Sequence, residues 1–175
     1  GLAVPTLDDI AINEILSDPA PGADPNGDGM ASTTQDEFVE IVNVTGGAMD
    51  LSGFELHDGA ASSLRHVFPA GTVIPAASSL IVFGGGTPTG LFGGSIVQTA
   101  STGSLGLNNG GDTVSVRTAA GVVVATVTYG GGGVPAGTDQ SIVRQPEYTG
   151  MFVPHGGIAG AGLQSPGVTV SGYGF

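Results

Sequence analysis

The 175-residue chain contains no Cys, no Trp and no Lys. The absence of Cys excludes disulfides, thiolate metal sites and Cys nucleophiles. The absence of Lys excludes a Walker-type phosphate loop, because this loop needs a Lys to bind the phosphates. Three Arg are too few to neutralise a nucleic-acid backbone, so we expect no nucleic-acid partner. No run of about 18 apolar residues occurs without Gly or Pro, so we also expect no membrane insertion.

The charges that are present are unevenly distributed. Twelve of the 15 Asp and Glu residues lie between Asp8 and Asp58, a span without Lys or Arg, and the net charge is −12. No charged residue occurs from His66 to Gly111 or from Tyr148 to Phe175. A free monomer usually has mixed charges over its surface. This composition therefore favours a surface covered by other subunits or by sugars, with hydration by Ser and Thr as the alternative.

The first residue is Gly1 rather than Met. Together with the acidic, Lys-free and Cys-free composition, this favours an exported bacterial-type protein, extracellular or at the cell surface, with a processed N-terminus. Both ends are apolar, so residues 1–9 and 168–175 are candidates for strand exchange or for packing against a neighbouring chain. Pairing of both ends within their own domain is the alternative.

Short runs rich in Val, Ile, Thr and Phe alternate with clusters of Gly, Pro, Asn and Asp, which is typical of strands and turns. No window keeps a helical apolar stripe free of Gly or Pro, so we expect almost no helix. The pattern predicts one all-β domain over residues 1–175, a β-sandwich of about 8–10 short strands with long Gly-rich loops. The expected strands are 10–16, 37–43, 53–58, 65–68, 79–83, 95–99, 113–118, 122–129 and 141–145, with further ones at 151–153 and 168–170.

Several motifs follow one another in a characteristic order. They are INEILSDP at 12–19, DEFVEIVN at 36–43, DLSGFELHDG at 50–59, HVFPAGTVIPAASSLIVFGGG at 66–86, LNNGGDTVSV at 107–116, VVVATVTYG at 122–130, DQSIVRQPE at 139–147 and SPG at 165–167. This order resembles the bacterial lamin-tail domain family, and it covers nearly the whole chain after about Asp9. Phe54 stands where the family usually has Trp. The resemblance implies an immunoglobulin-like β-sandwich that serves as a binding, adhesive or structural module without a catalytic centre.

One loop has the residue types of a calcium site. In DPNGDG, the side chains of Asp24, Asn26 and Asp28 alternate and Gly29 follows, as at the start of an EF-hand-type loop. The seventh position would contribute the Met30 carbonyl, and Asp36 would close the shell in place of a twelfth-position Glu. Asp18 is a further candidate ligand from the preceding strand end. A solvated Asp/Asn/Gly turn without an ion is the alternative interpretation.

The sequence contains no convincing catalytic constellation. Glu37 and Glu40 lie on one expected strand three residues apart, so they point to opposite faces and cannot act as a glycosidase pair. His57, His66 and Asp58 could form a metal trio only if two neighbouring strands brought them together. We therefore expect no enzyme. We expect Arg144 and Glu147 to pair with each other or to bond to backbone groups near the last loop.

Two functions are consistent with the sequence. The first is a non-enzymatic extracellular structural protein that assembles with copies of itself into a surface filament, layer or matrix and is stabilised by Ca²⁺. The second is a calcium-dependent adhesion or carbohydrate-binding module of a larger secreted protein. The second is weakened by the small number of aromatic residues, since sugar platforms usually need exposed Trp or Tyr.

Overall fold

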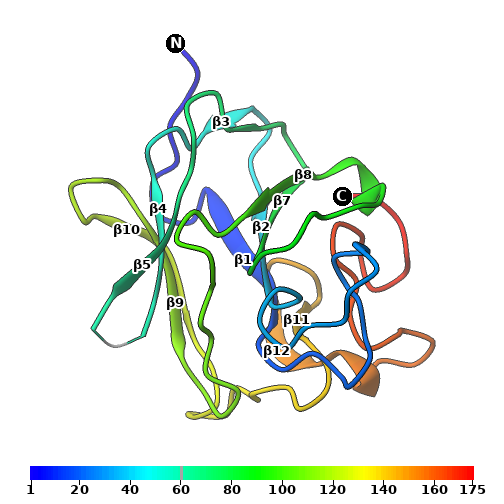
Figure 1. Ribbon diagram of the computed structural model, residues 1–175. Coiled ribbons are helices and arrows are strands. Elements are labelled where there is room, and N and C mark those ends of the chain that lie inside the picture. Colours follow the sequence, from blue (N-terminus) through cyan, green and yellow to red (C-terminus); the bar gives the residue numbers. More distant parts are fainter. Residues whose placement is uncertain (60) are drawn as a thin grey trace.

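The computed structural model describes residues 1–59 and 61–175. Within this part of the chain there are twelve short strands and two 3-10 turns (Figure 1). The elements are β1 (Ile10–Leu16), β2 (Phe38–Asn43), β3 (Met49–Asp50), β4 (Glu55–Asp58), β5 (Ser63–Val67), β6 (Val73–Ile74), β7 (Ser79–Phe83), η1 (Phe92–Gly94), β8 (Ile96–Thr99), β9 (Thr113–Arg117), β10 (Val123–Thr128), β11 (Ile142–Gln145), β12 (Met151–Pro154) and η2 (His155–Gly157).

The strands form two main sheets that enclose one core. The larger sheet has the order β12-β11-β1-β2-β7-β8, and the smaller has the order β10-β9-β4-β5. All pairs are antiparallel except β7–β8, and a two-stranded ribbon of β3 and β6 lies apart from both sheets. Side chains of both sheets share the core, for example Ile12 and Ile41 from the larger with Leu56 and Val116 from the smaller. The predicted all-β, immunoglobulin-like sandwich is confirmed.

The larger sheet is covered on both faces. In β2, Val39 and Ile41 point into the core, and Phe38 belongs to a second apolar cluster on the outer face with Leu16, Ile81 and Phe83. All six residues of β2 are buried. Figure 1 shows the loop between β1 and β2 and the C-terminal segment on the same side of this sheet, away from the four-stranded sheet. These segments therefore form a third layer over the outer face.

Most of the predicted strands are confirmed to within a few residues, and the Asp112–Tyr129 hairpin turns at Gly121 with φ of +83°. The two-residue strands β3 and β6 were not predicted, because they are too short to show an alternating pattern. The prediction of a strand at 168–170 is wrong. There the N–H of Val168 bonds to Ser165 and the N–H of Val170 to the Glu147 carboxylate, so the backbone forms turns instead.

Both ends of the chain contact their own domain. Ala3 forms a bridge to Met49, and its carbonyl accepts the N–H of Asp50 at 2.8 Å. At the other end, the Phe175 ring packs against the Tyr148 ring with 6.1 Å between centroids. Exchange of either end between chains stays a prediction. Among the described residues, no helix has the length and apolar character needed to cross a membrane.

Candidate functional site

The predicted calcium loop folds as a compact turn in which side-chain oxygens accept backbone N–H groups. Asp24 accepts the N–H groups of Asp28 at 3.2 Å and Gly29 at 2.8 Å. Asn26 Oδ1 accepts the Asp28 N–H at 2.9 Å, and Asp28 Oδ1 accepts the Met30 N–H at 2.9 Å. Short polar side chains that bond to the backbone two to five residues ahead explain why this sequence turns here.

Asp36 holds the end of this loop from inside. Its side chain is fully buried, and it accepts the Asn26 N–H at 3.2 Å and the Ser32 N–H at 2.7 Å. Burial raises the pKa of Asp36, the two N–H groups lower it, and the negative charges of Asp24 and Asp28 raise it further. Asp36 is therefore close enough to Asp24 and to Asp28 to be repelled by each, and a cation near them would relieve this repulsion.

The loop is also attached to the chain that follows β7. The Nδ2 group of Asn26 donates to the Gly85 carbonyl at 3.3 Å, and Asp28 Oδ2 accepts the Thr87 N–H at 3.1 Å. Gly86 lies between these contacts with φ of +74°, and a Cβ there would collide with the side chains of Asp28 and Asn26. Only Gly allows this close approach.

Met30 and Asp18, the other two predicted calcium ligands, do not contribute side-chain oxygens to this loop. The Met30 side chain is exposed, and Asp18 is bonded elsewhere, to the Asn109 Nδ2 group at 2.6 Å and the Asp139 N–H at 3.4 Å. Within residues 1–59 and 61–175, no three Asp, Glu or His side chains are arranged as a metal-binding group. The structure thus brings Asp24, Asn26, Asp28 and Asp36 into one loop without a formed shell of oxygens, and calcium binding stays a prediction.

A second acidic cluster, which sequence reasoning missed, lies beneath the C-terminal segment. Glu14 of β1 and Glu40 of β2 are directly opposite each other, and both are fully buried. Glu14 accepts hydrogen bonds from the Ser141 hydroxyl at 2.6 Å and from the Ser165 N–H and hydroxyl at 2.9 and 2.7 Å. Glu40 accepts the Gly167 N–H at 2.7 Å. The pair therefore binds the Ser165–Gly167 turn to the outer face of the sheet.

Burial controls the charge of these two carboxyl groups. It raises the pKa of Glu14, against the opposing effects of His155 and the serine hydrogen bonds. It raises the pKa of Glu40 well above its usual range, and the neighbouring Glu14 adds to this rise. A β-bulge between Ile12 and Glu14 changes the facing of β1, so alternation in the sequence could not have paired the two residues. The overlying turn covers both carboxyl groups.

The histidines do not form the metal trio considered above. Leu56 is opposite His66 across β4 and β5, so the adjacent His57 points to the other face of the sheet. Asp58 accepts two hydrogen bonds from the Arg65 guanidinium, at 2.7 and 3.0 Å. Each group thus has a separate structural role.

The family comparison agrees with this architecture. The model of the Lamin Tail Domain matches residues 3–131, and no curated protein matches the chain. The matched part ends after β10, whereas β11, β12 and the Ser165–Gly167 turn complete the larger sheet and its cover. The family is one of immunoglobulin-like structural domains not known for catalysis. Since the match spans well over half of its length, this chain belongs to the lamin tail domain family.

Proposed function

We propose that this chain is a non-enzymatic structural protein, extracellular or at the cell surface, that assembles with copies of itself through its β-sandwich. The observation that carries the proposal is the open outer edge of β12. Strand β12 pairs with β11 on one side only, and no other described residue bonds to the backbone of residues 151–153. Such an edge is a template for a strand of another chain.

This edge has little protection against pairing. Proteins usually guard exposed edges with Lys or other charges, and the sequence of β12 is Met-Phe-Val-Pro. Met151 is 72% exposed. Only the short length of the strand and Pro154, which has no N–H, limit pairing there. The sequence from Tyr148 to Phe175, which includes this strand, contains no charged side chain.

A charge placed at the edge tests the proposal. We expect the wild-type chain to form ordered polymers in light scattering and negative-stain images. Met151→Lys should keep the chain monomeric, since a Lys at a strand edge opposes pairing. Leu91→Lys, at a 92% exposed site outside every strand, is the matched control and should assemble like wild type. A monomeric wild type would refute self-assembly, and equal assembly of both variants would refute the role of β12.

Calcium is the second part of the proposal. The repulsion of Asp36 by Asp24 and Asp28 supports a stabilising effect of Ca²⁺ on this loop. Millimolar Ca²⁺ should raise the melting temperature of wild type and should not raise that of Asp24→Asn/Asp28→Asn. Asn keeps one of the two acceptor oxygens at each position while removing the charge. An unchanged melting temperature and no heat in a calcium titration would remove calcium from the proposal.

The runner-up function is a calcium-dependent adhesion or carbohydrate-binding module of a larger secreted protein. It is favoured by the position of Asp24 and Asp28, both half-buried and so partly accessible to a ligand. A chain that stays monomeric with and without Ca²⁺ but binds glycans on an array only with Ca²⁺ would support this function over assembly.

A further inference from the structure

Among the described residues, Arg144 is a cation without a carboxylate partner. Its Nε donates to the Ile12 carbonyl at 2.9 Å and its Nη1 to the Gly150 carbonyl at 2.8 Å, and its guanidinium lies 4.5 Å from the centroid of the Phe152 ring. Within the described part of the chain, no Asp or Glu forms a salt bridge with it. Burial lowers the pKa of Arg144, with no opposing contribution from a nearby anion. No described residue accepts a hydrogen bond from Nη2, whose N–H groups therefore remain available to a carboxylate.

The strand edge next to Arg144 is incomplete. The ladder between β1 and β11 covers only Glu14 and Ile15, since Arg144 and Gln145 of β11 pair with β12 but not with β1. The Asp9 carbonyl accepts the Val44 N–H on the β2 side, so by alternation the backbone groups of Ile10 and Ile12 face the β11 side. The Ile12 carbonyl is occupied by Arg144. No strand of the described chain pairs with this edge at Ile10.

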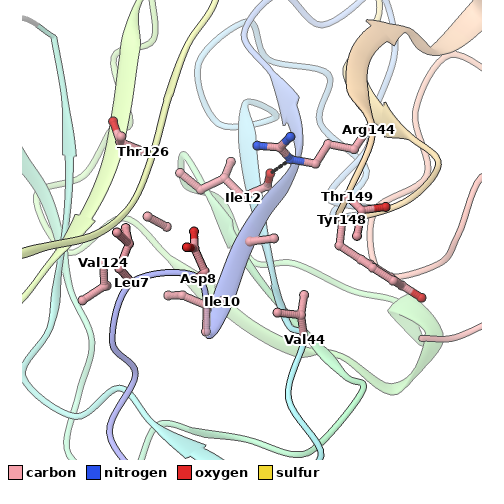
Figure 2. A pocket seen from close by; sticks show the side chains of 12 residues that line it. Leu7, Asp8, Ile10, Ile12, Val44, Val124, Thr126, Arg144, Tyr148 and Thr149 are labelled. Atoms are coloured by element: carbon pink, nitrogen blue, oxygen red, sulfur yellow. Dashed lines mark hydrogen bonds between the residues drawn. The ribbon is translucent and has the colours of Figure 1, made fainter.

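A pocket of about 440 Å³ lies along this edge (Figure 2). Its floor is residues 10–12 of β1, and one wall consists of residues 124–126 of β10 together with Leu7. The other wall is formed by Val44, Tyr148 and Thr149, and Arg144 lies at one end. Its volume is within the range of ligand pockets, and mainly apolar walls with a few charged or polar groups are typical of them.

We propose that this pocket binds the apolar C-terminal end of another polypeptide, which adds to the free edge of β1 and places its terminal carboxylate on Arg144. A peptide is favoured over a simple fatty acid because the floor presents backbone N–H and C=O groups, which a peptide backbone satisfies as an added strand. Main-chain hydrogen bonds along β1 give affinity, and the aliphatic walls select apolar side chains.

The charges fix the direction of the bound peptide. Asp8 lines the same pocket, and Figure 2 shows its carboxylate near Leu7 and Ile10, away from Arg144. A carboxylate would be repelled at the Asp8 end and attracted at the Arg144 end. The peptide therefore runs from Ile10 toward Ile12, parallel to β1, with its N-terminal part nearest Asp8.

The first experiment compares three probes in an NMR titration of the full chain. They are acetyl-Gly-Thr-Val-Val with a free carboxylate, the same peptide with a C-terminal amide, and hexanoate. We expect the free-carboxylate peptide to shift the amide signals of residues 10–12 and 124–126 and to bind at least tenfold more tightly than the other two probes. Equal binding of the amide, binding of hexanoate as tight as that of the peptide, or no shifts at these residues would each overturn the proposal.

Substitutions in the pocket test whether the peptide binds there. Arg144→Gln should weaken binding of the free-carboxylate peptide at least tenfold and should leave binding of the amide unchanged. Because Arg144 also holds two backbone carbonyls, a second variant is needed that leaves them intact. Leu7→Glu puts a negative charge on a 65% exposed wall residue and should weaken binding similarly. Leu2→Glu, a 55% exposed leucine outside the pocket, is its matched control. Unchanged affinity in Leu7→Glu and Arg144→Gln would refute the site.

Discussion

Replacing Glu37 by Gln should make the stability of this protein less dependent on pH. The Glu37 side chain is 3% exposed, and its Oε2 accepts the Leu107 N–H at 3.4 Å. Burial raises the pKa of Glu37 to about 7, against the opposing effects of backbone N–H groups and the positive charge of Arg65. The native state therefore holds a proton on Glu37 that the unfolded chain releases at lower pH.

The sign and size of the effect follow from this difference. A carboxyl group with a raised pKa stabilises the fold fully below its ordinary value of 4.5, and this stabilisation is lost as the pH rises through about 7. The rise from 4.5 to about 7 corresponds to about 3.4 kcal/mol. Because pH 5 already lies above the ordinary value of 4.5, part of this stabilisation is lost below the interval, and we expect a loss of about 2 kcal/mol between pH 5 and pH 8.

Urea denaturation at pH 5 and pH 8 measures the effect. The raised pKa values of Glu14 and Glu40 act in the same direction, so the comparison of variant and wild type isolates Glu37. Glu37→Gln should lose about 2 kcal/mol less than wild type over this interval. Asp139→Asn, at an exposed site, controls for the removal of one negative charge and should follow wild type. The reasoning would be refuted if Glu37→Gln and wild type lost the same free energy of unfolding.

Two further substitutions test the cover of the larger sheet. Phe38→Ala should lower the free energy of unfolding by about 3–5 kcal/mol in urea denaturation, because the fully buried Phe38 ring packs edge-on against Phe83 with 5.6 Å between centroids. A loss of free energy of unfolding below about 1 kcal/mol would mean that the cluster of Leu16, Phe38, Ile81 and Phe83 contributes little to stability. Ser165→Ala removes a hydroxyl that bonds to both Glu14 and His155, and it should cost about 1–3 kcal/mol. Limited proteolysis should then cut residues 156–175 faster than in wild type, and an unchanged cleavage rate would contradict the attachment of this segment through Ser165.

The sequence by itself determined the fold class and most of the strands. Alternating β-branched runs bounded by Gly, Pro, Asn and Asp specify strands locally, so β1 and β7 were predicted with their observed bounds. The motif order indicated the family, which the match over residues 3–131 confirms. The Asp, Asn and Gly residues of DPNGDG favoured a turn as the alternative to a calcium loop, and this turn is held by contacts formed within a few residues; calcium binding stays a prediction.

The tertiary structure alone decided which distant residues meet. The pairing of Glu14 with Glu40 depends on strand register and on a bulge, and their cover by Ser165 joins residues 151 positions apart. The gap beside Ile10 exists because the pairing of β11 with β1 stops at Val143 and Glu14, and only the assembled sheet places Arg144 at the end of that gap. Local patterns specify backbone conformation, whereas register, edge pairing and burial depend on packing between sheets that no sequence window contains.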